Sequence, residues 1–313
     1  MSDHSHSKLQ NGGVVALLAL VCCFLWGSAF PCIKIGYAML HIATEDTASQ
    51  ILFAGCRFTL AGILTVAIGS VLSRKFLYPA KTSWGMVGKL ALAQTIIQYL
   101  FFYIGVANTS GVKGSIIVAS NVFISILISS LVFHYEKLGK FKVMGCLIGF
   151  AGVVLINLNG TGLDMGMSLF GEGFVFLSTV SYACSSVLIR QFSQKENPVT
   201  LSGWQFFIGG LVMAAVGAAM GGHIEGFTVG SVALLIYLAM ISAVAYSIWG
   251  ILLKHNPVGR VAVFGFMNPV FGVTLSAILL QEQNQAFTIQ GLISLILVCI
   301  GIYLVNRDFS GKK

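Results

Sequence analysis

The side chains best suited to bind a small solute are polar and aromatic residues inside long apolar stretches. Gln94 and Gln98 are four residues apart and therefore share one face of a helix, and Tyr99 and Tyr103 flank them. Amide groups offer hydrogen-bond donors and acceptors, while tyrosine adds a hydroxyl to an aromatic wall. Because polar groups are costly in a bilayer and usually face the bundle interior, we expect these four to line a solute cavity.

Other apolar stretches carry the same kinds of side chain. Asn121 and Ser125 are again four residues apart, and Asn268 precedes a proline. The expected set is completed by Trp26, Ser28, Tyr246 and Trp249. Amides and hydroxyls between aromatic walls would suit an amino acid or a similar amphipathic solute. The alternative for each Ser, Asn or Gln is a hydrogen bond between helices, worth about 0.6 kcal/mol, that only stabilises the bundle.

Two cations lie within or beside the apolar stretches. Arg57 is near the middle of its stretch, where a charge needs a partner or a water-filled cavity. It could attract a substrate carboxylate, or it could be a structural anchor that binds backbone carbonyls. Lys34 is closer to the end of the first stretch and could be a gate cation or extend to the lipid headgroups.

Acidic residues are absent from the middle of every apolar stretch. Those that come closest, Glu136, Glu172 and Glu282, are at the ends. Proton-driven antiporters use a carboxylate inside the membrane to load and release the proton. We therefore expect a uniporter or exchanger without tight proton coupling, and a solute that is neutral, zwitterionic or anionic instead of cationic.

The elements that must position these residues are membrane-spanning helices. Apolar residues make up 57% of the 313-residue chain and charged residues only 9%, against roughly a quarter in a soluble domain. A spanning helix needs about 20 residues, so the chain has room for ten spans. The sequence predicts an all-α membrane protein with spans at 14–36, 49–72, 84–107, 112–134, 140–158, 170–192, 200–221, 230–253, 261–281 and 287–306.

The distribution of Lys and Arg sets the expected orientation. With the tail 1–13 in the cytoplasm, fifteen lysines and arginines fall on the cytoplasmic side, and only Lys34 and Lys113 fall outside. Positive charges are enriched in cytoplasmic loops. We expect a cell-membrane protein with both tails, 1–13 and 307–313, in the cytoplasm.

The chain also repeats itself at long range. A shift of 148 residues carries Gly55, Phe58 and Gly62 onto Gly203, Phe206 and Gly210. A shift of 147 carries Tyr99 onto Tyr246. This predicts two repeats of five spans, 14–158 and 170–306. Because five is odd, the second repeat enters the membrane from the opposite side, and such inverted repeats support alternating access.

The order of these motifs resembles a known family. The first half has Trp26-Gly27-Ser28, then Arg57-Phe58, then Glu136 before a glycine-rich helix, and the second half has Trp204-Gln205-Phe206, Asn268-Pro269 and Glu282 before Gly291. The pattern is similar to that of the EamA-type permeases of the drug/metabolite transporter superfamily. The resemblance implies ten helices in inverted repeats and efflux or exchange of small metabolites, amino acids among them. His134-Tyr135 before Glu136 departs from the family pattern, at a loop end.

Other classes of protein find less support. The seven cysteines lie in apolar stretches without metal-ligand spacing, so we expect no metal site and no cofactor. No sequence motif of a hydrolase or metalloprotease occurs, which disfavours a membrane-embedded enzyme. A scaffold or receptor would have no evident use for the repeat. The net charge of +8 is expected to face lipid headgroups and not nucleic acid. The expected partners are a small-molecule substrate and membrane lipid, and the oligomeric state stays open.

Overall fold

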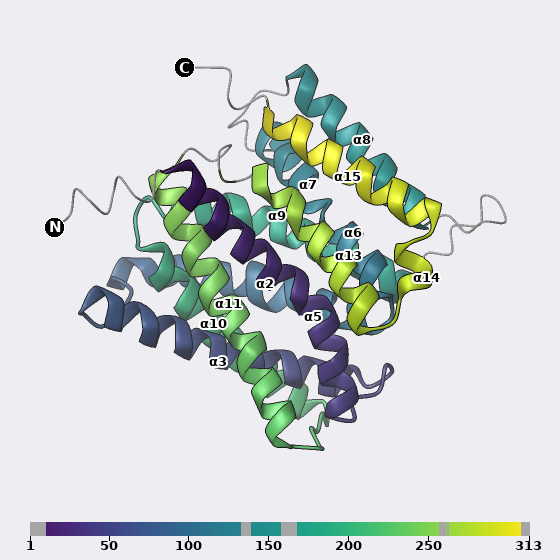
Figure 1. Ribbon diagram of the computed structural model, residues 1–313. Helices are drawn as coiled ribbons and strands as arrows, with labels where there is room; N and C mark the ends of the chain where they lie inside the picture. Colours follow the sequence, from purple (N-terminus) through teal and green to yellow (C-terminus); the bar gives the residue numbers. More distant parts are fainter. Residues whose placement is uncertain (1–10, 133–138, 158–167, 257–260, 262, 308–313) are drawn as a thin grey trace. The chain divides into compact units, whose positions relative to one another are not determined.

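The protein is built from helices that follow the predicted spans. The computed structural model describes residues 11–132, 139–157, 168–256, 261 and 263–307, and over these residues it contains helices and no strands (Figure 1). Seven helices are long and apolar enough to cross a membrane: Gly12–Met39, Thr47–Ser73, Lys81–Ala107, Gly111–Val132, Leu169–Ile189, Pro198–Ala219 and Val229–Leu252. The expectation of an all-helical membrane protein is confirmed in this part of the chain, while the number of ten spans stays a prediction.

The elements in chain order are mostly single helices. They are α2 (Gly12–Met39), α3 (Thr47–Ser73), η1 (Lys81–Ser83), α4 (Trp84–Leu90), η2 (Ala91–Ile97), α5 (Gln98–Ala107), α6 (Gly111–Val118), α7 (Asn121–Leu127), η3 (Ile128–Val132), α8 (Lys140–Asn157), η4 (Leu169–Gly173), α9 (Phe174–Phe192), α10 (Pro198–Ala219), α11 (Val229–His255), η5 (Val263–Phe266), α13 (Met267–Leu279), α14 (Gln283–Ala286) and α15 (Ile289–Arg307). The elements α8, α13 and α15 occupy the three predicted spans outside the seven long helices.

Two of the predicted spans contain an irregular segment. The span predicted over 112–134 is present as Gly111–Val132, but within it α6 and α7 are separated by a turn at Ala119 and Ser120. Ser120 N donates to Ile117 O and Val122 N to Ala119 O, three residues back instead of four. Serine and asparagine have low helix propensity, which favours a break where Ser120 precedes Asn121. The span over Lys81–Ala107 contains the π-helical segment η2.

The described chain forms two compact units, and each draws helices from both halves of the sequence. Of the described residues, the first unit takes those within 1–30, 110–167 and 248–313, and the second takes those within 31–109 and 168–247. The divide passes through α2 at Pro31, which lacks a backbone donor and weakens the helix there. The compact units therefore differ from the sequence halves 14–158 and 170–306.

In the second unit, α3 and α10 pack side by side through small residues (Figure 1). A Cβ on Gly55 would lie 2.2 Å from Ala214 N, and one on Gly62 would lie 2.3 Å from Phe207 N. The partner glycines make the matching contacts: Gly203 meets Val66 and Gly210 meets Thr59. Adding 148 to one residue number of a contact and subtracting 148 from the other gives the matching contact. The Gly55–Ala214 contact corresponds to Gly203–Val66, and the Gly62–Phe207 contact to Gly210–Thr59. The spacing found in the sequence thus relates contacts in space.

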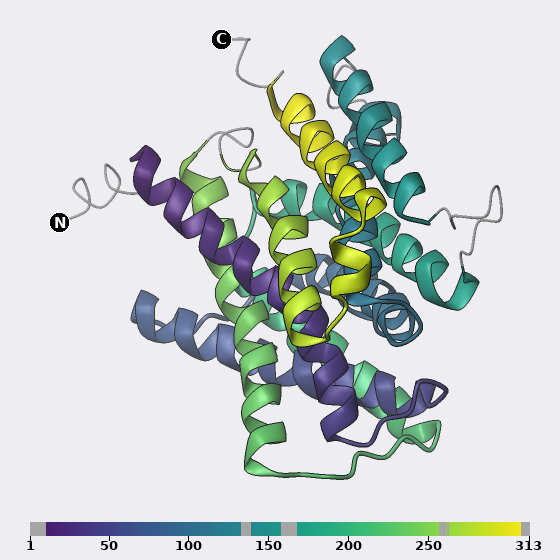
Figure 2. The same cartoon turned by 45° about the vertical axis from the view of Figure 1, so that its right-hand side comes forward.

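In the first unit, α8 and α15 run side by side in both views (Figures 1 and 2). A Cβ on Gly145 would lie 2.7 Å from Gly301 O, and one on Gly301 would lie 2.7 Å from Gly145 O. In the same unit, a Cβ on Gly27 would lie 2.8 Å from Gly272 N of α13. The glycine of the Trp-Gly-Ser motif is therefore required for close helix packing.

Candidate functional site

The centre of the second unit holds a buried arginine that joins three helices. Arg57 of α3 is 2% exposed. Its Nη1 donates to Tyr103 Oη of α5 at 2.7 Å, its Nε to Leu238 O of α11 at 3.0 Å, and its Nη2 to Ser242 Oγ of α11 at 3.3 Å. We call Arg57, Tyr99, Tyr103, Ser242 and Tyr246 the arginine cluster.

All the hydrogen-bond partners of Arg57 are neutral. Among the residues that the structure describes, no carboxylate lies within ion-pair distance of its guanidinium. Its Cζ lies 5.0 Å from the centre of the Phe58 ring and 6.0 Å from that of Tyr103, so aromatic faces supply part of the stabilisation. The cluster therefore carries a net positive charge in a buried, largely apolar place.

An aromatic wall lies beside this cation. The rings of Phe58 and Tyr99 are 4.0 Å apart, and those of Phe206 and Tyr246 are 5.1 Å apart. The hydroxyls of Tyr99 and Tyr246 are hydrogen-bonded at 3.1 Å. Tyr99 and Tyr246 are the pair that the sequence repeat matches, as are Phe58 and Phe206, whose rings are 5.5 Å apart. The repeat thus brings matched residues together on the wall.

Two glutamines form a second polar group in the same unit. Gln205 Nε2 of α10 donates to Gln94 Oε1 of η2 at 2.5 Å. Within the described part of the chain, Gln205 Oε1 and Gln98 Oε1 are buried and have no hydrogen-bond partner. Leaving such an acceptor unsatisfied costs about 1–3 kcal/mol, which calls for an explanation. These two oxygens are ready acceptors for a donor brought by a ligand.

Gln94 lies within the irregular backbone of η2, and Gln98 follows directly as the first residue of α5. π-helical turns, whose hydrogen bonds join residues five apart, are frequent at functional sites. Here Ala93 O accepts hydrogen bonds both from Gln98 N within the span and from Ser181 Oγ of α9, the latter at 2.7 Å. Gln94 is 2% exposed and Gln98 is 8% exposed, so both face the interior, as their spacing predicts.

The remaining predicted site residues except Lys34 lie in the first unit. The rings of Trp26 and Trp249 are 5.1 Å apart, and Ser28 Oγ donates to Leu25 O within its own helix at 2.8 Å. Asn121 opens α7 just after the helix break, with Ser125 one turn later, and both are half-buried. The buried oxygens without a described partner include Ser120 Oγ at the break and Asn268 Oδ1 at the start of α13.

Comparison with known proteins identifies the family. The sequence model of the EamA-like transporter family matches residues 13–158 and again 169–307. The chain belongs to the EamA-like transporter family. A protein described as a probable amino-acid metabolite efflux pump of Escherichia coli strain K12 is 26% identical, with 94% of each chain covered. A chloroplastic WAT1-related protein of Arabidopsis thaliana is 26% identical over 90% of this chain and 67% of its own.

A solved structure shares the fold of this EamA-like chain. It has a TM-score of 0.63 and 19% identity, and the match covers 93% of this chain and 96% of the other.

An uncharacterized transporter of Synechocystis is 27% identical over 91% of this chain and 87% of its own. Family and relatives establish a multi-pass membrane transporter.

Several polar partners in this EamA-like protein are absent from the predicted set. Ser242, Gln205 and Ser181 each bond a predicted residue or its helix. Ser242 is four residues before Tyr246, the spacing that selected Gln94 and Gln98, so the same rule could have found it. Lys34, proposed as a gate or anchor, is half-buried in the second unit.

The carboxylates lie at helix ends, where the sequence places them. Glu172, 5% exposed, accepts hydrogen bonds from Thr109 Oγ1 at 2.7 Å and from Ser168 N at 2.9 Å. Glu282 accepts from Gly111 N at 3.0 Å and Val112 N at 2.9 Å, and so caps the N-terminus of α6. The donors to both carboxylates lie at the starts of helices or in the segments just before them. Glu136 lies outside the described residues.

Proposed function

We propose that this protein moves small zwitterionic or neutral metabolites, amino acids among them, across the cell membrane by alternating access, as a uniporter or exchanger working in the efflux direction. The family match, which covers both halves of the chain, carries this proposal. The relative described as an amino-acid metabolite efflux pump supports the substrate class and the direction.

The proposed architecture is ten spans in two inverted repeats, with both termini in the cytoplasm. The family match over two separate segments supports the repeat, and so do the reciprocal contacts of α3 and α10. The break between α6 and α7 supports a transport role, since discontinuous helices mark solute sites in transporters. Pro31, at the divide in α2, is suited to act as a hinge during alternation.

The second unit offers groups that complement both charges of an amino acid. Arg57 has five N–H donors and uses three of them on neutral acceptors, so two remain for a carboxylate. The buried oxygens of Gln98 and Gln205 can accept from an ammonium group. The Phe58, Tyr99, Phe206 and Tyr246 rings would contact an apolar side chain. Arg57 thus combines the two roles that the sequence left open, as anchor of three helices and as contact for the solute.

The position of the acids supports a mechanism without tight proton coupling. The arginine cluster contains hydroxyls and a guanidinium, and the glutamines of the same unit are amides; all of these keep one charge state over the physiological pH range. Glu172 and Glu282 are engaged at helix and turn ends. We therefore propose that solute exchange needs no pH gradient.

Solute analogues test the proposed charge complementarity. Proteoliposomes preloaded with one amino acid should take up the labelled form by counterflow, with equal pH on both sides. An analogue without the carboxylate and an analogue without the ammonium should each compete at least tenfold more weakly than the parent. Equal competition by all three would refute the assigned roles of Arg57 and the glutamines, and a strict requirement for a pH gradient would refute the uncoupled mechanism.

A further inference from the structure

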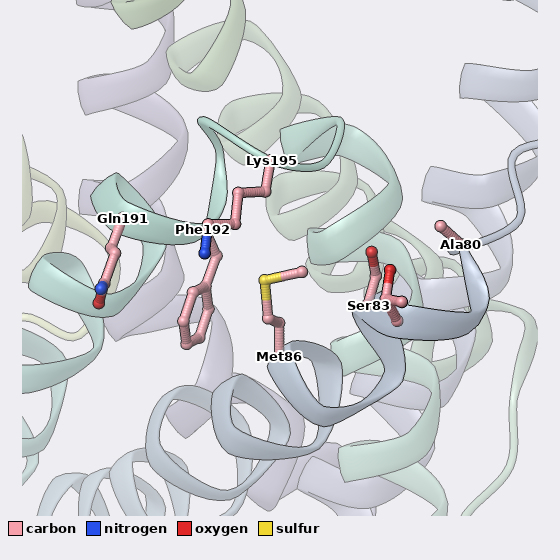
Figure 3. Close-up of a pocket in the computed structure, with 7 residues that line it drawn as sticks. Ala80, Ser83, Met86, Gln191, Phe192 and Lys195 are labelled. Carbon is pink, nitrogen blue, oxygen red and sulfur yellow. The ribbon is translucent and has the colours of Figure 1, made fainter.

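A second candidate site lies at the N-terminal end of the span Lys81–Ala107, the span that also carries Gln94 and Tyr103. The structure has a pocket of about 310 Å³ between the start of that span and the end of α9 (Figure 3). Its walls are Thr82, Ser83 and Met86 on one side and Gln191, Phe192 and Lys195 on the other. None of these residues belongs to the predicted solute site.

The pocket combines an apolar floor with polar and cationic edges. Figure 3 shows Met86, Phe192 and Lys195 around the same space. Phe192 is buried, while Thr82 and Lys195 are exposed at the edge. The turn that ends α9, in which Lys195 N donates to Phe192 O at 2.9 Å, holds the lysine beside the phenylalanine. Such a pocket fits a ligand with an anionic head and an apolar continuation.

A group of aromatic rings next to the pocket indicates its depth in the membrane. Tyr78, Trp84 and Trp204 lie with ring centres 5.3–5.4 Å apart, and Trp204 Nε1 donates to Leu77 O at 2.9 Å. Phe76, in the same loop, is 69% exposed. Tyrosine and tryptophan are enriched where the bilayer meets water, so this end of the unit is suited to the level of the lipid headgroups.

The charge near the pocket favours an anion. Arg74, Lys75 and Lys195 lie in the two connecting segments and Lys81 begins η1, against the single carboxylate Glu196 in these segments. Glu196 accepts from Ala80 N at 3.0 Å and from Asn197 N at 2.9 Å. Partial burial acts to raise its pKa, but these hydrogen bonds, with Ser83 and Lys75, outweigh burial and hold the pKa below its usual value. Glu196 stays ionised and bound to the backbone, and the lysines leave a net positive charge.

We propose that this pocket binds the phosphate of an anionic phospholipid in the cytoplasmic leaflet. Lys195 pairs with the phosphate, Thr82 donates a hydrogen bond to it, and Met86 and Phe192 contact the glycerol and the first methylenes. Basic pockets between spanning helices bind acidic headgroups on the cytoplasmic side in general. The choice of leaflet rests on the proposed topology, whereas the binding chemistry does not.

Native mass spectrometry of the full chain in neutral detergent tests the site. The protein is titrated with phosphatidylglycerol and, separately, with phosphatidylcholine. We expect the protein to retain phosphatidylglycerol more tightly than phosphatidylcholine. In Lys195→Gln the retention of phosphatidylglycerol should fall about fivefold, the size of effect expected when one lysine near an anionic headgroup is removed. Thr82→Phe, which fills the pocket, should reduce it as well. Lys140→Gln removes an exposed lysine from the first unit, on the side predicted to be cytoplasmic, and should leave retention unchanged.

Each opposite outcome overturns the proposal. Equal retention of both lipids would show that no anion site exists, and unchanged retention in both pocket variants would place the lipid elsewhere. Displacement of phosphatidylglycerol by millimolar inorganic phosphate, with the same dependence on Lys195, would assign the pocket to free phosphate. Counterflow is measured separately, so a chain that binds phosphatidylglycerol but exchanges no solute would refute the proposed transport and leave this site standing.

Discussion

Removing one hydroxyl from the arginine cluster tests whether Arg57 is held as the structure describes. In Tyr103→Phe the ring keeps its contacts, and only the acceptor at 2.7 Å from Arg57 Nη1 is lost. Tyr103 is fully buried, so water cannot replace the hydroxyl without rearrangement. The hydrogen bond that the Tyr37 hydroxyl donates to the backbone oxygen of Tyr103, at 3.0 Å, is unaffected by the change.

The size of the effect follows from the charge of the donor. Hydrogen bonds to charged groups contribute about 1.5–3 kcal/mol, whereas neutral bonds between membrane helices average about 0.6 kcal/mol. Tyr99→Phe is the matched control, because it removes a hydroxyl from the same helix that bonds a neutral partner, Tyr246 Oη at 3.1 Å. We therefore expect Tyr103→Phe to lower the free energy of unfolding by at least about 1 kcal/mol more than Tyr99→Phe.

The measurement is equilibrium unfolding in mixed micelles with increasing SDS, followed by circular dichroism, for the wild type and both variants. Equal or smaller destabilisation by Tyr103→Phe would mean that Arg57 does not depend on Tyr103. In that case the placement of its guanidinium against α5 would be wrong, and with it the count of donors left for a substrate carboxylate.

Two further predictions concern packing and pH. Gly62→Ala places a methyl 2.3 Å from Phe207 N, a backbone atom that cannot move alone, so we expect the yield of folded protein or its melting temperature to fall sharply. Gly85→Ala meets no atom within 4 Å and should have little effect; equal loss in both would refute the α3–α10 contact. At Asp46 partial burial acts to raise the pKa, but hydrogen bonds from the N–H and the hydroxyl of Ser49 outweigh it and hold the pKa below its usual value. The ionised Asp46 therefore stabilises the fold above about pH 4, and this stabilisation is lost as the pH falls through the lowered pKa of the folded state. Asp46→Asn should therefore flatten the melting temperature between pH 5 and pH 3, and an unchanged pH profile would contradict this role.

Helix positions and the spacing of matched residues could be read from the sequence because both leave local or periodic signals there. The Gly55, Phe58 and Gly62 spacing predicted the repeat, and the structure adds that the glycines of both copies pack α3 against α10, as small residues do at close helix contacts in membranes. The bond between Tyr99 and Tyr246 joins residues that the repeat matches. Tyr99 and Tyr246 come close because α5 and α11, the helices that carry them, both contribute to the arginine cluster.

Other features depend on interactions that no local pattern encodes. The break at Ser120 and the π-helical turn of η2 arise where tertiary contacts outweigh helix propensity, so apolar periodicity predicts unbroken helices there. The division into compact units that mix the two halves likewise follows from packing, and the sequence order conceals it. The neutral surroundings of Arg57 required the positions of Leu238 and Ser242, far away in sequence.

The most direct test of the account is counterflow in proteoliposomes preloaded in turn with a panel of unlabelled amino acids and metabolites, for the wild type and Gln98→Leu. Replacement of an unsatisfied buried amide by an apolar side chain of similar size should leave the melting temperature unchanged or raised, because the lost group makes no described hydrogen bond through its oxygen. The account predicts accumulation of label with at least one wild-type preload and its loss in the stable variant. No flux with any solute in folded, correctly inserted wild-type protein, or full flux in Gln98→Leu, would contradict it.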